Sequence, residues 1–101
     1  DTFQFSPFAI RDIDEVWNYI AERNVDAAIR LMRGFQQKFI LIAENPASGR
    51  SRDDIIVGLR QFPHKNYSIY YFTIDSGVEI YRVLHSSRDR VQVFDDSIGS
   101  I

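Results

Sequence analysis

The chain has 101 residues, of which 45% are hydrophobic and 14% aromatic, and it carries a net charge of −2. This composition is typical of one globular domain with a sizeable core and excludes a disordered chain. The absence of cysteine excludes disulfide and thiolate chemistry and is typical of a reducing compartment, so we expect a cytoplasmic protein. Neither a membrane protein nor sequence-specific nucleic-acid binding is expected, because no apolar run approaches ~20 residues and the net charge is slightly negative.

The first third of the chain predicts a short strand and a helix. Phe3 and Phe5 alternate along Thr2–Ser6 as in a strand. Ser6-Pro7 is typical of a helix start, because serine caps well and proline suits the first helical position. An apolar stripe then follows at helical spacing, formed by Ala9, Ile13, Val16, Trp17 and Ile20. The opposite, exposed side is assigned to Arg11, Asp12, Asp14, Glu15, Asn18 and Glu22.

A second, longer helix is predicted from about Val25 to Ala43, and Pro46 ends it. Its core-facing residues are Ala28, Leu31, Met32, Phe35, Phe39 and Ile42. Gly34 inside this helix costs about 1 kcal/mol relative to alanine, and we expect a close approach of the two helices there as compensation. The short link Arg23–Asp26 predicts that the helices are antiparallel neighbours.

The second half predicts three consecutive strands, Val57–Phe62, Tyr67–Ile74 and Val78–His85. Asp75-Ser76-Gly77 is a turn signal, so the last two strands are expected to form an antiparallel hairpin. Asn45–Asp54 before them is predicted to be a solvated loop, because it lacks the pattern of a phosphate-binding loop. A short last strand is expected at Val91–Phe94.

The fold class is therefore α+β, with the order β-α-α-β-β-β in a single domain over residues 1–101. A helical hairpin packs on one face of a small, mainly antiparallel sheet. Strand alternation predicts one face from Ile69, Tyr71 and Thr73, and the other from Tyr70, Phe72 and Ile74. On the last strand, one face is expected to hold Val78, Ile80, Arg82 and Leu84, and the opposite face Tyr81, Val83 and His85. Because two helices cover only one face, we expect the other to be an exposed binding surface.

Few residues carry recognisable chemistry. His64 and His85 are the only histidines, and no HExxH, GxSxG or glycine-rich nucleotide motif occurs. We therefore expect no metal site, no cofactor and no covalent catalysis. His85 could act as a general acid or base, or it could pack against Tyr71 or Tyr81. Arg82 points from a strand interior onto an apolar face, where it requires either an internal ion pair or a binding surface.

Several motifs match one known family. They are Pro46-Ala47-Ser48-Gly49-Arg50 after the long helix, Gly58-Leu59-Arg60, the strand Tyr67–Phe72, and Tyr81-Arg82-Val83-Leu84-His85 followed by Arg88-Asp89. With these motifs the chain resembles the ParE toxins of type II toxin–antitoxin systems, within the RelE/ParE superfamily, over nearly its whole length. The resemblance implies a small bacterial toxin with the β-α-α-β-β-β fold.

The same resemblance implies a mode of action and partners. ParE toxins poison DNA gyrase by binding, without catalysis of their own, and a neighbouring gene encodes an antitoxin whose C-terminal segment wraps the toxin. We expect this antitoxin to dock across the sheet face and the helical hairpin. The candidate interface residues are Arg60, Tyr71, Arg82, His85, Arg88 and Arg90. Either a homodimer or a toxin–antitoxin hetero-oligomer is compatible with the family.

Two alternatives remain open. The RelE branch of the superfamily cuts messenger RNA on the ribosome with basic side chains and a C-terminal tyrosine or histidine. The arginine of that branch is matched by Arg88. The basic residue expected early in its second sheet strand falls near Ser68, and its acid/base residue falls near Phe94, so neither of these two positions matches. A missing acid/base removes a factor of about 100 to 10,000 in rate. The other alternative is an inactive family member that only binds its antitoxin.

Overall fold

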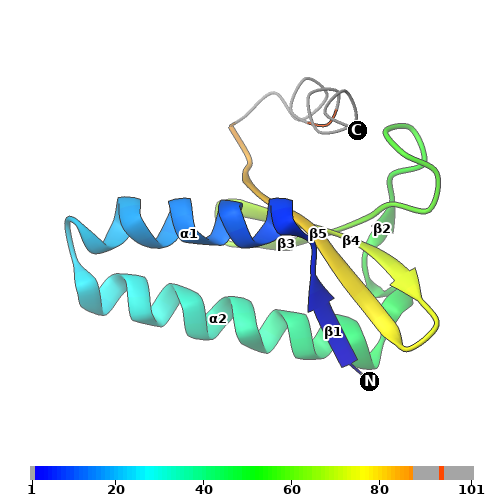
Figure 1. Cartoon of the computed structure of the whole chain (residues 1–101), viewed down its shortest axis with the longest axis horizontal. Coiled ribbons are helices and arrows are strands. Elements are labelled where there is room, and N and C mark those ends of the chain that lie inside the picture. Colours follow the sequence, from blue (N-terminus) through cyan, green and yellow to red (C-terminus); the bar gives the residue numbers. More distant parts are fainter. Residues whose placement is uncertain (1, 88–93, 95–101) are drawn as a thin grey trace.

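The computed structural model describes residues 2–87 and 94. Its helices are α1 (Pro7–Ala21) and α2 (Val25–Glu44), followed by a short 3₁₀ turn, η1 (Pro46–Ser48). Its strands are β1 (Thr2–Phe5), β2 (Arg50–Ser51), β3 (Arg60–His64), β4 (Tyr67–Ile74) and β5 (Gly77–His85). The sheet order is β1-β5-β4-β3-β2, with β1 parallel to β5 and every other pair antiparallel (Figure 1). The predicted α+β class is confirmed.

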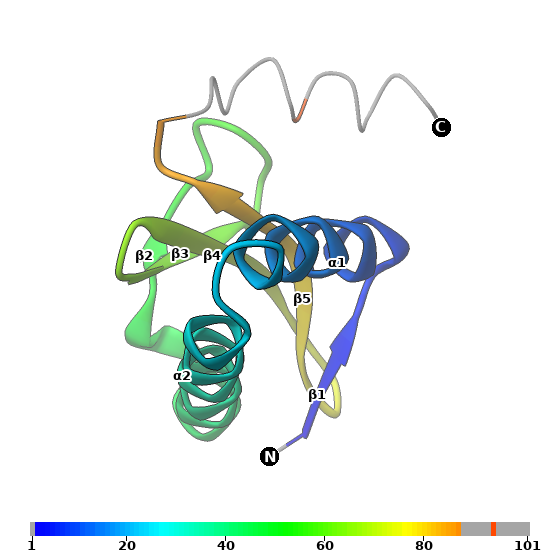
Figure 2. The same cartoon turned by 90° about the vertical axis from the view of Figure 1, so that its left-hand side faces the viewer.

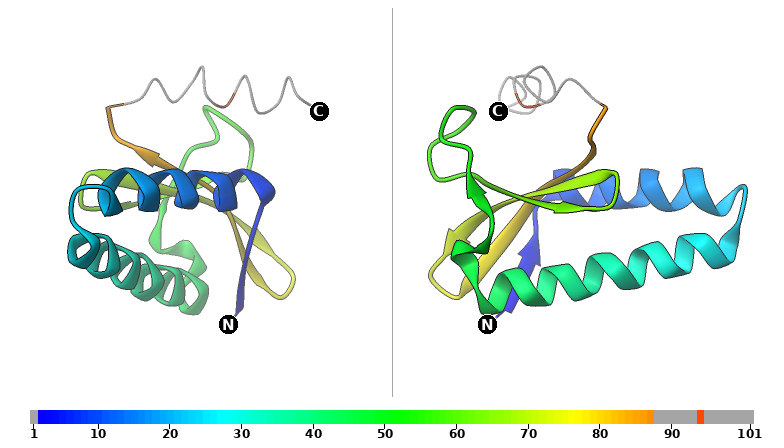
Figure 3. Two further views of the ribbon diagram at one scale, coloured as in Figure 1. Left: turned by 60° about the vertical axis from the view of Figure 1, so that its left-hand side comes forward. Right: turned by 180° about the vertical axis from the view of Figure 1, so that it is seen from behind.

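The two helices begin where the sequence predicts. The Ser6 hydroxyl accepts a hydrogen bond from the Ala9 amide at 3.0 Å, and Pro7 is the first helical residue. At the start of α2, the Asn24 side chain caps the Ala27 amide at 3.0 Å. The short link between them makes an antiparallel hairpin, which is seen from two sides in Figure 3.

One face of the sheet packs against the helical hairpin. The buried strand residues on this face are Ile69, Tyr71, Val78, Ile80 and Val83. The helices contribute Ala9, Leu31, Phe35, Phe39, Ile42 and Ala43. This cluster is the main core, and it contains four of the six predicted core-facing positions of α2. Of the other two, Ala28 is fully buried but not part of the cluster, and Met32 is partly buried and packs against it.

A β-bulge changes the predicted alternation of the last strand. Tyr70 pairs with Arg82, but the next residue, Tyr71, pairs with Ile80, so Tyr81 is an extra residue in β5. The prediction of a single face for Val78, Ile80, Arg82 and Leu84 is therefore wrong. Before the bulge Ile80 faces the helices, and after it Val83 does, while Leu84 lies on the other face.

The other face of the sheet has its own buried cluster. Leu59, Tyr70, Leu84 and Phe94 are buried there, and Ile55, Ile56, Phe72 and Tyr81 pack around them. The expectation that this face is left uncovered is wrong, because the connection between β2 and β3 folds over it. Apolar residues in that connection supply the cover that the helices cannot provide.

Three further predictions need correction. The predicted strand Val57–Phe62 begins only at Arg60, because Gly58 has a φ of 88° and turns the chain. Gly34 approaches β3 and not α1: a Cβ on it would lie 2.5 Å from His64 Nε2. Of the predicted strand Val91–Phe94, residues 91–93 lie outside the described residues, and Phe94 has a helical backbone. In the described part of the chain, neither helix combines the length and apolarity needed to cross a membrane.

Candidate functional site

A buried ion pair joins α1 to β5. The Arg82 guanidinium donates from Nε to Asp12 Oδ2 at 2.7 Å and from Nη2 to Oδ1 at 2.9 Å. Both residues are buried, with 8% of Arg82 and 5% of Asp12 exposed. Arg82 therefore forms the internal ion pair, one of its two predicted alternatives, and its assignment to an exposed partner surface is wrong. A charged side chain is stable at this depth because its partner is bidentate.

The Asp12 carboxylate also accepts a hydrogen bond from the backbone edge of β5. β1 pairs with β5 only as far as Ile80, and α1 lies beside the remainder of β5 (Figure 2). There the Val83 amide donates to Asp12 Oδ2 at 3.0 Å. Asp12 thus takes the place of a neighbouring strand for this amide.

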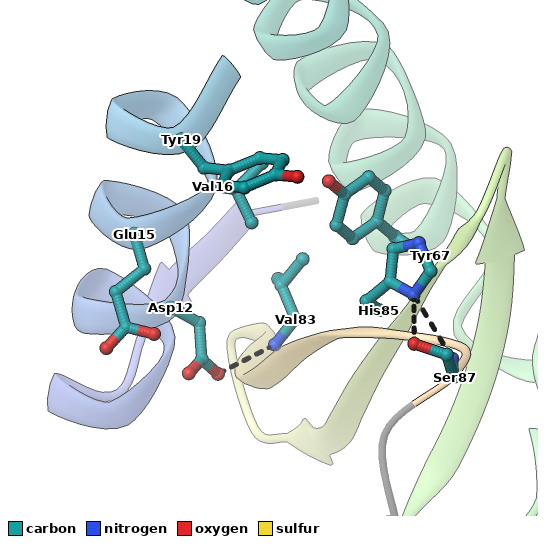
Figure 4. Close-up of a pocket in the computed structure, with 8 residues that line it drawn as sticks. All are labelled: Asp12, Glu15, Val16, Tyr19, Tyr67, Val83, His85 and Ser87. Atoms are coloured by element: carbon teal, nitrogen blue, oxygen red, sulfur yellow. Dashed lines mark hydrogen bonds between the residues drawn. The ribbon is translucent and has the colours of Figure 1, made fainter. Parts of the chain in front are cut away.

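A groove opens between α1 and the end of β5. It has a volume of about 420 Å³ and is lined by Asp12, Glu15, Val16, Tyr19, Tyr67, Val83, His85 and Ser87 (Figure 4). Tyr19 from α1 and Tyr67 from β4 direct their hydroxyls toward each other from opposite walls. Burial, with a smaller contribution from Tyr19, raises the pKa of Tyr67. Tyr67 is therefore a protonated hydrogen-bond donor at neutral pH.

His85 lies in this groove with one nitrogen already engaged. The Ser87 amide donates to His85 Nδ1 at 3.2 Å, and the Ser87 hydroxyl lies 2.7 Å from the same atom. Because a backbone amide can only donate, this pattern assigns the proton of the neutral ring to Nε2. The ring packs edge-on against Tyr67, with 5.3 Å between centroids, and not against Tyr71 or Tyr81 as expected.

Two other predicted interface residues hold a loop in place. Tyr71 is fully buried; its hydroxyl donates to the Pro46 carbonyl at 2.7 Å and accepts from the Gly49 amide at 2.8 Å. Arg60 is half-buried and donates from Nη1 to the Gly49 carbonyl. The expectation of an exposed Tyr71 is wrong, because its ring belongs to the main core. Both residues fix the segment between α2 and β2.

The six predicted interface residues therefore do not form one surface. Arg60 and Tyr71 lie at the loop after α2, Arg82 lies under α1, and His85 lies in the groove. Arg88 and Arg90 lie outside the described residues. Sequence reasoning missed the groove residues Tyr19, Tyr67 and Asp12. Only Asp12 carried a usable signal: it follows Ala9 by three positions and precedes Val16 by four, which puts it on the apolar stripe. Its assignment to the exposed side of the helix is wrong, because Asp12 is buried.

Two of the three positions compared with the RelE branch are occupied by buried residues, and the third, Arg88, lies outside the described residues. Ser68 is buried, and its hydroxyl accepts a hydrogen bond from Gln61 Nε2 at 2.8 Å. Phe94 is 1% exposed; its ring packs edge-on against Tyr70 at 4.8 Å and stacks on Tyr81 at 6.0 Å. A buried hydrocarbon ring cannot transfer a proton. In the described residues, no three His, Asp or Glu side chains gather so that they could hold a metal ion.

Comparison with known proteins identifies the family. A family model described as the ParE toxin of the type II toxin–antitoxin system parDE matches residues 3–90. Toxin ParE1 of Caulobacter vibrioides is 31% identical over 86 residues, covering 84% of this chain and 88% of that protein. Toxin ParE1 of Mycobacterium tuberculosis is 30% identical over 89 residues, covering 86% and 91%.

A solved structure supports the fold. A chain from the chromosomal ParDE toxin–antitoxin system of P. aeruginosa superposes with a TM-score of 0.71 at 13% identity, covering 83% of this chain and 94% of that one. The resemblance noted from the sequence motifs is thus confirmed by an independent match that spans most of the chain. The protein belongs to the ParE toxin family of type II toxin–antitoxin systems.

Proposed function

We propose that this chain inhibits DNA gyrase by binding it in the bacterial cytoplasm, and that an antitoxin encoded by a neighbouring gene neutralises it. The observation that carries the proposal is the match to the ParE toxin family over residues 3–90. Binding is favoured over catalysis because the acid/base position of the RelE branch is occupied by the buried Phe94 ring.

A supercoiling assay tests the proposal. Purified chain incubated with gyrase and relaxed plasmid is expected to abolish supercoiling and to accumulate linear DNA, and addition of the antitoxin is expected to restore supercoiling. A bacterial translation extract serves as the counter-assay. Cleavage of messenger RNA in that extract, with gyrase unaffected, would assign the chain to the ribonuclease branch. Tight antitoxin binding without either activity would identify an inactive family member.

A further inference from the structure

Strand β1 forms one outer edge of the sheet. It pairs with β5 along its whole length, and within the described residues no strand lies on its other side (Figure 2). Just after β1, the Ser6 amide donates to the Ile80 carbonyl of β5 at 2.9 Å. Successive backbone groups of a strand point to opposite sides. The amides and carbonyls of Phe3 and Phe5 therefore point away from β5, toward the open edge.

The sequence of β1 does not protect this edge. Edge strands are usually protected from pairing by a charged side chain, a proline or a bulge. β1 reads Thr-Phe-Gln-Phe, which contains neither a charge nor a proline, and its register with β5 is regular. The opposite edge of the sheet, β2, is only two residues long, and one of them is the exposed Arg50. β1 is therefore the edge that is suited to strand addition.

Apolar side chains lie beside the open edge, on the side of the helices. Phe3 and Phe5 line a hollow of about 380 Å³, together with Ile10 of α1 and Met32 of α2. Phe5 is 37% exposed and Ile10 is 53% exposed. The Phe5 ring is held in place by edge-on contacts with Phe3 at 5.7 Å and with Phe39 at 5.3 Å. A strand added to β1 would bury this fixed apolar surface with its own side chains.

The edge is complementary to a second copy of itself. A two-fold dimer needs a surface on which residue i of one copy meets residue j of the other, and j meets i. Phe3-Gln4-Phe5 reads the same in both directions. When two β1 strands lie antiparallel with Gln4 opposite Gln4, each Phe3 lies opposite Phe5 of the second copy. Each Phe3–Phe5 pair then exchanges both of its backbone hydrogen bonds, because these are the residues whose backbone groups point outward.

We propose that two copies of this chain form a two-fold dimer in which their β1 strands pair antiparallel around Gln4. The two five-stranded sheets then form one continuous sheet, and the phenylalanine rings of both copies meet on the side of the helices. The assembly stops at the dimer, because the outer edges that remain are the short, charged β2 strands. This proposal concerns the chain by itself and is independent of its action on gyrase.

Disulfide formation tests the register. The chain has no cysteine, so Gln4→Cys introduces a single thiol per copy. In the proposed register the two Cα atoms at this position are about 4.5 Å apart, which is close enough for a disulfide. Under mild oxidation, Gln4→Cys is expected to form a covalent dimer about tenfold or more faster than Gln37→Cys, because pairing raises the local thiol concentration. Gln37, an exposed residue of α2, is the matched control.

A charge change tests the same position without a covalent bond. Gln4 is exposed and pairs with Glu79 of β5, so Gln4→Glu places carboxylates of both copies next to one another in the dimer. Sedimentation of the wild type over a series of concentrations is expected to show a dimer, and Gln4→Glu is expected to weaken it about fivefold or more. An equal mixture of Gln4→Glu and Gln4→Lys should recover the dimer, and Gln37→Glu should leave it unchanged. Circular dichroism checks that each variant is folded.

Amide hydrogen exchange locates the contact in the wild type. The Phe3 and Phe5 amides are expected to exchange more slowly as the protein concentration rises, because only the dimer protects them. A monomer at every concentration would overturn the proposal. So would a dimer that Gln4→Glu does not weaken, or equal oxidation rates for Gln4→Cys and Gln37→Cys. Protection of Phe3 and Phe5 that appears only after the antitoxin is added would assign the edge to the antitoxin and would also overturn the proposal.

Discussion

The Asp12 carboxylate on α1 accepts two hydrogen bonds from the Arg82 guanidinium on β5, at 2.7 and 2.9 Å, and a third from the Val83 amide at 3.0 Å. The two residues of the ion pair, Asp12 and Arg82, lie 70 positions apart in the sequence. The carboxylate therefore neutralises a buried cation and also satisfies the sheet edge that β1 leaves open. It fixes α1 relative to β5, and these two elements form opposite walls of the groove that Asp12 and His85 line.

Removal of this carboxylate is expected to destabilise the fold strongly. Asp12→Ala leaves a buried guanidinium and a buried amide without their acceptor, so the free energy of unfolding should fall by about 3–5 kcal/mol. Asp14→Ala, at an exposed position of the same helix, is the control and should change it by less than about 0.5 kcal/mol. Urea denaturation followed by circular dichroism measures both. A loss below about 1 kcal/mol in Asp12→Ala would show that the ion pair does not hold α1 on the sheet.

Gly34→Ala tests the close contact between α2 and β3. Alanine is the better helix former by about 1 kcal/mol, but its Cβ would lie 2.5 Å from His64 Nε2. We expect a net loss of about 1–3 kcal/mol from this overpacking. In the background His64→Ala the same substitution should instead stabilise the fold. Thermal denaturation of the four proteins gives the coupling, and additive effects of the two substitutions would contradict the contact.

His64 should make stability depend on pH. Burial lowers its pKa, and Lys38 and Lys65 lower it further. In the unfolded chain His64 has an ordinary histidine pKa of ~6.5, so on acidification the unfolded chain takes up a proton before the folded chain does. The contribution of His64 to the free energy of unfolding is therefore complete above pH ~6.5 and is lost as the pH falls below that value. Between pH 7 and 5 the free energy of unfolding should decrease more steeply in the wild type than in His64→Asn. Parallel curves for the two proteins would contradict this assignment.

Tyr71→Phe tests whether the loop after α2 depends on one hydroxyl. The buried hydroxyl bonds both the Pro46 carbonyl and the Gly49 amide, so its removal leaves two polar groups unsatisfied and should cost about 1–3 kcal/mol. Amide hydrogen exchange at Gly49 should also become faster. Tyr19→Phe, at an exposed ring, is the matched control and should leave stability within about 0.5 kcal/mol. Unchanged protection at Gly49 in Tyr71→Phe would contradict the role given to Tyr71.

Local signals made much of the fold predictable. Ser6, Asn24 and the turn before Val78 act on their sequence neighbours, so the helix starts and the β4–β5 hairpin were predicted correctly. The parallel pairing of β1 with β5 and the bulge at Tyr81 arise only when distant strands meet. A one-residue bulge reverses every later side chain of a strand, which is why the face of Leu84 was predicted wrongly.

The candidate site was predicted less well than the fold, for a physical reason. Arginine and aromatic residues are equally suited to a binding surface and to contacts inside a domain. Tyr71 and Arg82 make contacts inside the domain, because the fold brings Gly49 next to Tyr71 and Asp12 next to Arg82. His85 lies in the groove beside α1, and its neighbours there, Tyr19 and Tyr67, come from other elements. The periodicities of helices and strands relate residues within one element, so they do not predict that residues of α1, β4 and β5 meet in one groove.

The central claim is that this ParE-family chain acts on gyrase by binding. Its most direct test is the form of plasmid DNA after gyrase treatment with increasing amounts of the purified chain, resolved on an agarose gel. Our account predicts that supercoiled plasmid disappears and linear plasmid increases with the dose, and that an excess of antitoxin reverses both changes. Full supercoiling at a large molar excess of folded chain would contradict it.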